Sequence, residues 1–246
     1  MVRTTGSGPP LVMVPGWGMH SGVWGEFAQA LARHFTLVRV ELPGHGAAPA
    51  LRSWNLADLA EELTLLEREA FWLGWSLGGQ VLMAMAGRRP ERVRGLVLLA
   101  ANPRFVAADD WPGMDPRLFE VFRRQLREDP TTTLRRFLGL ITQGVPRPVA
   151  RKVRQLWQSV PSPAPADLCR GLDLLARLDL RPSLREVRCP VVIVGGEGDA
   201  LVPPEALRRS AALFPEAHLT MVVAGGHVPF LVEAASLADQ IRTAFL

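Results

Sequence analysis

Apolar and polar positions along this chain follow two different periods. In the first hundred residues, short runs rich in Val and Leu alternate with longer stretches in which apolar residues recur at helical spacing. The short runs predict β-strands at 11–14, 37–41, 71–75 and 95–100. The longer stretches predict helices at 24–34, 56–69 and 80–88. Because strands buried on both faces are apolar throughout, the alternation favours a parallel sheet with helices on both faces.

The alternation stops after Asn102 and Pro103. Residues 105–184 contain no convincing strand, and their amphipathic patterns predict helices at 116–126, 132–141, 148–157 and 166–178. Strand-like runs resume at 189–194 and 219–223, and a final helix is predicted at 229–245. We therefore expect an α/β core formed by residues 1–104 and 185–246, with residues 105–184 inserted as a helical cap, or lid.

Size and charge narrow the choice of partners. The chain has 246 residues, 48% of them hydrophobic, which is enough to bury a substantial core. Its net charge of +4 is uneven, because residues 117–154 hold ten basic and three acidic side chains, a net of +7. This segment is either a solvated helical face or a docking face for an acidic partner. Nucleic acid is a poor candidate, since no recognised binding motif accompanies the charge.

Other features favour a cytoplasmic protein. No apolar run approaches the roughly 20 residues that span a bilayer, and the first ten residues have no apolar core of a secretory signal. Cys169 and Cys189 are isolated, without the spacing of a metal or redox site. We expect a monomer without a metal, an organic cofactor or a membrane partner.

The sequence Gly74-Trp75-Ser76-Leu77-Gly78 carries the strongest chemical signal. It reads G-x-S-x-G, directly after a predicted strand and before a predicted helix, which is the context of a nucleophile elbow. A serine on such a turn is exposed above the sheet edge at the positive end of the following helix, where a negatively charged intermediate is stabilised. Ser76 is therefore a candidate nucleophile.

A serine nucleophile needs a base and an acid that orients the base. Of five histidines, only His227 lies in a Gly-rich loop between a strand-like run and the final helix. His20 and His45 also follow strands in Gly-rich loops and are expected to border the cleft. Asp199 ends a glycine turn after the strand-like run 189–194, and Glu197 is the competing carboxylate. The order Ser76, Asp199, His227 is typical of α/β-hydrolases.

Acyl transfer also needs donors for the developing oxyanion. We expect one from the backbone N–H of Leu77, at the start of the elbow helix, and one from the N–H of Trp17, after the first apolar run. For the indole of Trp17 two interpretations stay open, a wall of the acyl pocket or an aromatic ring packed beside a turn.

Several motifs together resemble the α/β-hydrolase superfamily: Gly16-Trp17-Gly18, Leu42-Pro43-Gly44-His45-Gly46, Gly74 to Gly79, Pro90 to Val93, Gly198-Asp199 and Gly226-His227. Within it the chain is similar to the biotin-pathway carboxylesterase (BioH) family, through Trp72 to Gly79, Asp110-Trp111-Pro112-Gly113 and Arg136-Phe137-Leu138. Pro15 departs from the pattern, since the superfamily commonly has His there.

The resemblance implies an α/β-hydrolase fold and roles for individual residues. Ser76 would be the nucleophile, His227 the base and Asp199 its orienting acid, with Trp17 and Leu77 as the oxyanion hole. The cap segment Phe137, Leu138, Gly139, Leu140 and Ile141 would line an acyl tunnel. The same segment also reads as the core face of an amphipathic helix, and the two interpretations are compatible.

The resemblance further implies a substrate and a partner. This family hydrolyses the methyl ester of a pimeloyl chain on acyl carrier protein and releases methanol. Because acyl carrier protein is acidic, the basic cap would be its docking face. Arg136 matches a basic docking position, while other such positions hold Thr132 and valines, so Arg147, Arg151 and Arg154 would have to substitute.

Three alternatives remain at this point. A general short-chain carboxylesterase or lipase-like enzyme without a carrier partner would use the same triad. A haloperoxidase-like or carbon–carbon bond hydrolase would share the triad and differ in the pocket. A non-catalytic binding module is the third, and the complete triad speaks against it. Dehalogenases and epoxide hydrolases of this fold use Asp at the elbow, so Ser76 argues against both.

Overall fold

The computed structural model describes residues 3–51, 54–67 and 69–246. The described chain forms a seven-stranded sheet with the order β1-β3-β2-β4-β5-β6-β7. The strands are Arg3–Gly6 (β1), Pro10–Val14 (β2), Thr36–Arg39 (β3), Ala70–Trp75 (β4), Val93–Leu99 (β5), Val191–Gly196 (β6) and Ala217–Val222 (β7). From β3 to β7 all neighbouring strands are parallel, which confirms the predicted sheet.

The edge strand β1 was not predicted. It pairs antiparallel with β3, and its Thr4 and Thr5 are exposed. A four-residue edge strand with exposed polar side chains has no apolar run, so hydrophobic periodicity does not detect it. The central strands β4 and β6 are buried at every position, as the uninterrupted apolar runs indicated.

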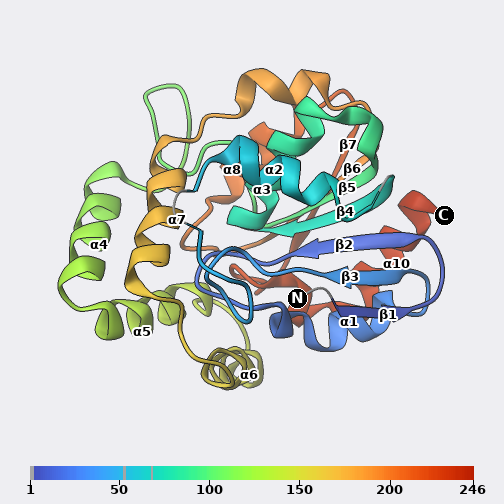
Figure 1. Ribbon diagram of the computed structural model, residues 1–246. Coiled ribbons are helices and arrows are strands. Elements are labelled where there is room, and N and C mark those ends of the chain that lie inside the picture. The colour runs from blue at the N-terminus through green and yellow to red at the C-terminus, as the bar shows by residue number, and fades with distance from the viewer. Residues whose placement is uncertain (1–2, 52–53, 68) are drawn as a thin grey trace.

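Helices cover both faces of the sheet (Figure 1). Those that flank it are Gly25–Leu31 (α1), Leu56–Thr64 (α2), Leu77–Arg88 (α3), Pro204–Ala211 (α8), Pro229–Val232 (α9) and Ala234–Phe245 (α10). α1 packs against α10 on one face, and α2 packs against α3 on the other. Short 3-10 helices lie at Ser21–Trp24 (η1), Pro90–Arg92 (η2) and Arg181–Glu186 (η3).

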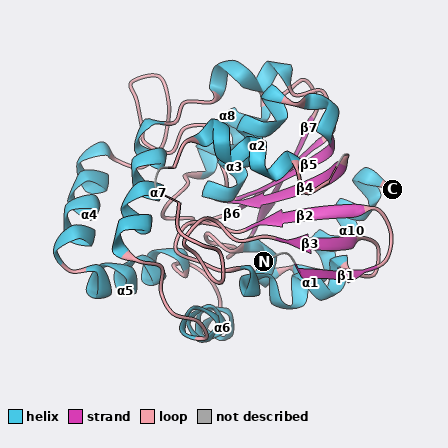
Figure 2. Ribbon diagram, in the orientation of Figure 1, coloured by secondary structure: helices cyan, strands magenta, loops and turns pink. Residues whose placement is uncertain are grey.

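Four further helices lie between β5 and β6 in the chain: Pro116–Glu128 (α4), Pro130–Ile141 (α5), Arg147–Gln158 (α6) and Pro165–Arg177 (α7). Figure 2 shows the arrowheads of β2 and β3 pointing toward the side of the molecule where α4, α5 and α7 lie. The helices therefore stand beyond the carboxyl edge of the sheet, where loops that carry functional residues gather in α/β folds. The exact limits of the cap, 105 and 184, stay a prediction.

Two predicted helices differ most from the structure. α2 ends at Thr64 instead of residue 69, and Arg68 lies outside the described residues. The final helix is two helices, because Glu233 adopts φ −122° and ψ 50° between α9 and α10. A local break of this kind leaves the apolar period intact, so the pattern alone did not show it. No helix among the described residues is long and apolar enough to cross a membrane.

Candidate active site

Ser76 occupies a tight turn between β4 and α3. Its φ of 52° and ψ of −120° lie outside the regions that residues with side chains favour. Its N–H donates to the carbonyl of Leu99 on the neighbouring strand at 2.9 Å, and its own carbonyl accepts from Gln80 of α3 at 3.2 Å. From Ala70 to Ala86, Ser76 is the one residue that is not buried. The turn therefore presents a single side chain, the serine hydroxyl, outside the packed core.

The glycines of the motif are required by close packing. A Cβ on Gly74 would lie 2.6 Å from the Cα of Gly79, inside van der Waals contact. A Cβ on Gly78 would clash with the carbonyl oxygens of Val14 and Pro15. Because only glycine fits, α3 can begin directly after Ser76 and pack against the loop that follows β2.

The side chains of Asp199 and His227 form a buried pair. Oδ2 of Asp199 lies 2.8 Å from Nδ1 of His227, and both side chains are almost completely buried. The other carboxylate oxygen, Oδ1, accepts from the N–H groups of Leu201 at 2.8 Å and Val202 at 3.0 Å. With Asp199 held by three hydrogen bonds, Nδ1 of His227 carries the proton that faces the carboxylate, and Nε2 is left to act as a base.

Backbone hydrogen bonds hold the loops of Asp199 and His227 together. The N–H of Glu197 donates to Val222 at 2.9 Å, and the N–H of Gly226 donates to Glu197 at 3.3 Å. The side chain of Glu197, the competing carboxylate, is exposed and has no hydrogen bond to His227. The geometry therefore pairs His227 with Asp199.

Trp75 connects the elbow to the His227 loop. Its indole Nε1 donates to the carbonyl of His227 at 2.8 Å, and the two rings lie 5.6 Å apart between centroids. Ser76 follows Trp75 directly, so the serine and the imidazole belong to two loops joined by this bond. The Ser76 hydroxyl makes no hydrogen bond within the described part of the chain.

The two predicted oxyanion donors lie beside Ser76. Gly16 to Met19 form a turn closed by a 3.3 Å bond from Met19 N–H to Gly16 carbonyl, and a Cβ on Gly16 would lie 3.2 Å from the Cβ of Ser76. Within the described residues, neither the N–H of Trp17 nor that of Leu77 donates to a protein acceptor. Backbone donors without a partner next to a nucleophile are suited to bind an oxyanion.

A cavity of about 590 Å³ opens from Ser76 toward the helices α4, α5 and α7. Its walls are mainly aromatic and aliphatic, with side chains from Trp17, Phe105, Met114, Leu118, Phe119, Val121, Phe122, Phe137, Leu140, Leu172, Leu175 and Leu201. Trp17 packs edge-on against Phe137 and Phe122, at centroid distances of 4.7 and 5.9 Å. The volume and lining fit an apolar acyl chain.

The predicted lining segment 137–141 divides between the cavity and the core. Phe137, Gly139 and Leu140 line the cavity, whereas Leu138 and Ile141 do not and are buried among core residues. Both interpretations of this amphipathic segment therefore apply, each to a different face of α5. The cavity residues of α4 and α7 were not predicted from the sequence, although the amphipathic patterns of those helices marked their apolar faces.

The predicted docking arginines occupy two different environments. Arg136 is exposed, donates to Oε1 of Gln125 at 3.1 Å and borders the cavity that contains Ser76. Arg147, Arg151 and Arg154 lie on α6, are exposed and make no ion pair or side-chain hydrogen bond in the described structure. α6 itself is anchored to α1 by a 2.6 Å contact between Lys152 Nζ and Glu26 Oε1.

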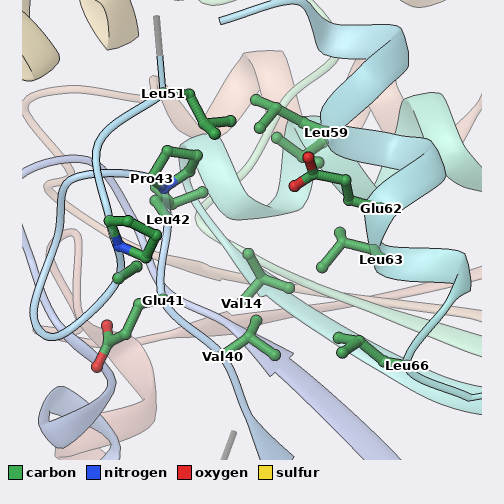
Figure 3. A pocket seen from close by; sticks show the side chains of 13 residues that line it. Val14, Val40, Glu41, Leu42, Pro43, Leu51, Leu59, Glu62, Leu63 and Leu66 are labelled. Atoms are coloured by element: carbon green, nitrogen blue, oxygen red, sulfur yellow. The ribbon is translucent and has the colours of Figure 1, made fainter. Parts of the chain in front are cut away.

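A second hollow of about 210 Å³, whose lining does not include Ser76, lies between β2, the loop after β3, α2 and α3 (Figure 3). Its labelled side chains are aliphatic apart from Glu41 and Glu62, and it holds no serine or histidine. The described residues also contain no group of three or more His, Cys, Asp or Glu that could hold a metal ion. The cavity beside Ser76 therefore carries the candidate chemistry.

Comparison with known proteins finds similar sequences and structures. A family model described as alpha/beta hydrolase fold matches residues 9–234. The chain is 39% identical to a pimeloyl-[acyl-carrier protein] methyl ester esterase of Xanthomonas oryzae, covering 98% of this chain and 96% of that protein. It is 40% identical to a protein of the same name from Nitrosomonas europaea, covering 94% and 93%. An esterase from Exiguobacterium antarcticum has the same fold, with a TM-score of 0.89 and 20% identity over 98% of this chain and 93% of that one.

Proposed function

The chain belongs to the alpha/beta hydrolase family, and we propose that it is a serine carboxylesterase that hydrolyses the methyl ester of pimeloyl-[acyl-carrier protein] in biotin synthesis. The substrate class is supported by the relatives that bear this name, because the sequence match to them covers nearly the whole chain. The observation that carries the reaction type is the buried His227–Asp199 pair, joined through Trp75 to a positive-φ serine that opens into an apolar cavity.

In the proposed mechanism, Nε2 of His227 accepts the proton of the Ser76 hydroxyl as Oγ attacks the ester carbonyl. The N–H groups of Trp17 and Leu77 bind the oxyanion of the tetrahedral intermediate. The carbon–oxygen bond to the methoxy group then breaks, and His227 returns the proton so that methanol leaves. Asp199 stabilises the imidazolium form of His227 between these steps.

Water completes the reaction by the same route. His227 removes a proton from a water molecule, which attacks the acyl-enzyme carbonyl while the same donors bind the oxyanion. Collapse of this intermediate releases the free carboxylate and returns the proton to Ser76. These steps use the side chains and backbone donors already described, and the proposal assigns no role to a metal or organic cofactor.

The acyl chain would lie in the cavity, with Phe137, Gly139 and Leu140 of α5 in its wall. Helices α4 to α7 would act as a lid that shields the acyl-enzyme from bulk water. The carrier arm would leave past Arg136 and Gln125, the polar side chains of the lining besides Ser76. Three arginines of α6 are exposed and form no ion pair with the described residues, and they would attract the acidic carrier protein: Arg147, Arg151 and Arg154.

A comparison of two substrates tests the proposal against a general esterase. We expect a carrier-bound pimeloyl methyl ester to be hydrolysed with a kcat/KM at least tenfold above that of a short p-nitrophenyl ester. Equal or lower efficiency with the carrier-bound ester would favour a general carboxylesterase. Complementation of a biotin-requiring strain that lacks its own methyl-ester hydrolase gives the physiological readout. The proposed cytoplasmic location and monomeric state can be tested by fractionation and by mass in solution.

A further inference from the structure

His45 is a completely buried histidine beside the candidate site that the proposed mechanism does not use. It lies in the loop after β3. The N–H of Gly18 donates to its Nε2 at 3.0 Å, and its Nδ1 lies 2.8 Å from the carbonyl oxygen of Pro43. Because a carbonyl can only accept, Nδ1 carries the hydrogen and Nε2 is the acceptor. Both bonds are made at once only by the neutral imidazole.

The surroundings of His45 favour this neutral form. Burial is the main cause that lowers the pKa of His45, and it outweighs the Pro43 carbonyl and the Asp167 carboxylate, which raise it. Asp167 of α7 is itself paired with Arg170 at 2.8 Å. On its other side the imidazole packs against the Trp54 ring, at 5.7 Å between centroids. His45 is therefore a fixed acceptor for a backbone N–H.

The bond to Gly18 acts on the turn that holds a predicted oxyanion donor. Trp17 is the second and Gly18 the third residue of the Gly16 to Met19 turn, and Gly18 has a φ of +72°. The peptide between Trp17 and Gly18 is held by His45, while the Trp17 indole is held by the Leu168 carbonyl at 2.8 Å. The N–H of Trp17 belongs to the preceding peptide, which shares the Cα of Trp17, so loosening of the Trp17–Gly18 peptide would let the Trp17 N–H shift away from Ser76.

We propose that His45 is a positioning residue of the oxyanion hole, which holds the Gly18 N–H so that the Trp17 N–H points at the reacting carbonyl oxygen. The inference rests on the proposed function, because it assigns a partner to the oxyanion turn of that reaction. His45 touches neither substrate nor nucleophile in this role. Its loss should weaken binding of the charged intermediate more than binding of the ester.

Two amide substitutions separate this role from simple packing. In His45→Gln the amide oxygen reaches the former position of Nε2 and can still accept from Gly18. In His45→Asn the shorter amide reaches only the former position of Nδ1, so the Gly18 acceptor is lost. Both variants are polar and uncharged. His218→Asn is the matched control for the substitution itself, because His218 is exposed on β7 and lies outside the cavity of Ser76.

The experiment measures kcat and KM on a short p-nitrophenyl ester, together with inhibition by an alkyl boronic acid, which forms a charged tetrahedral adduct. We expect His45→Asn to lower kcat about 10- to 100-fold and to weaken boronic acid binding by a similar factor, with KM within about threefold. His45→Gln should recover most of both losses. His218→Asn should leave kcat, KM and boronic acid affinity unchanged.

Each other result has a defined meaning. If His45→Asn keeps the wild-type kcat and boronic acid affinity, or if Gln and Asn are equally impaired, the positioning role is wrong. If His45→Asn does not fold, His45→Gln alone decides, since loss of kcat and boronic acid affinity in a folded Gln variant overturns the role and near-normal values support it. If the wild type is inactive on esters, or Ser76→Ala is as active as the wild type, the proposed function fails independently of His45.

Discussion

The indole of Trp75 donates a 2.8 Å hydrogen bond to the main-chain carbonyl of His227. Trp75 is the last residue of β4 and directly precedes Ser76, and its ring also packs against Phe230 of α9 at 5.4 Å between centroids. One side chain therefore fixes the loop of the proposed base relative to the turn of the proposed nucleophile. Because a misplacement of about 1 Å costs a large part of catalysis, this bond is a means of holding the two groups in register.

Replacing Ser76 by Ala should abolish ester hydrolysis and leave the fold intact, because the hydroxyl makes no hydrogen bond in the described structure and Cβ is retained. Activity should fall by at least about 10³-fold. Steady-state kinetics and circular dichroism measure the two effects. A fluorophosphonate probe should label the wild type and not the variant. Labelling of the variant at the wild-type rate would show that another residue is the nucleophile.

Replacing Asp199 by Asn should lower kcat by about 10³- to 10⁴-fold. The amide can donate to Nδ1 of His227, which would then present its hydrogen on Nε2 and could not accept the Ser76 proton. The kcat on a p-nitrophenyl ester is the readout. Glu197→Gln is the control and should keep wild-type activity, because that carboxylate is exposed and has no hydrogen bond to His227. Equal losses in both variants would contradict the pairing.

The fold was largely predictable because β4 and β6 are uninterrupted apolar runs, and β5 is one from Gly95 onward, as parallel strands buried on both faces require. The elbow was recognisable from its sequence motif, because close contacts with backbone atoms allow only glycine at the motif's glycine positions. The contact of His45 with Gly18 was not predictable, since it joins residues 27 positions apart through a ring nitrogen. The division of α5 between Gly139 and Ile141 likewise depends on how the helix is rotated against its neighbours.

Replacing each of two glycines in the α4–α7 region by Ala should change the free energy of unfolding in opposite directions. A Cβ on Gly171 of α7 would lie 2.5 Å from Cδ1 and 2.9 Å from Nε1 of the Trp17 indole, whereas a Cβ on Gly139 of α5 meets nothing within 4 Å. We expect Gly171→Ala to lower the free energy of unfolding by about 1–3 kcal/mol and to reduce kcat. Gly139→Ala should raise it by up to about 1 kcal/mol through helix propensity. Urea unfolding measures both, and equal shifts would contradict the tight fit of the indole.

The free energy of unfolding should decrease as the pH falls, and His45 should account for part of this decrease. Burial lowers the pKa of His45 in the folded state below its ordinary value of 6.5. Below about pH 6.5 the unfolded chain therefore binds a proton that the folded protein does not, and unfolding is favoured as the pH falls. His45→Gln should remove up to about 1.4 kcal/mol per pH unit of this dependence. Urea unfolding of both proteins between pH 5 and 7.5 is the measurement, and parallel curves would contradict it.

Charge reversal on α6 should affect only the carrier-bound substrate. Arg151 and Arg154 are exposed and unpaired in the described structure, so Arg151→Glu with Arg154→Glu should disturb no internal contact. We expect KM for a carrier-bound ester to rise at least tenfold at low salt, with kinetics on a p-nitrophenyl ester unchanged. Arg33→Glu is the control, since Arg33 is exposed before β3, at the opposite edge of the sheet. An unchanged KM would remove α6 from the docking face.

The bond from the Trp17 indole to the Leu168 carbonyl spans two regions of the chain that are 151 positions apart. Leu168 belongs to α7, and the backbone of Trp17 belongs to the oxyanion turn. One hydrogen bond therefore connects a helix that lines the substrate cavity to the turn that carries a predicted oxyanion donor. A displacement of α7 would also shift the backbone of Trp17, so the geometry of the proposed oxyanion hole depends on how this helix packs.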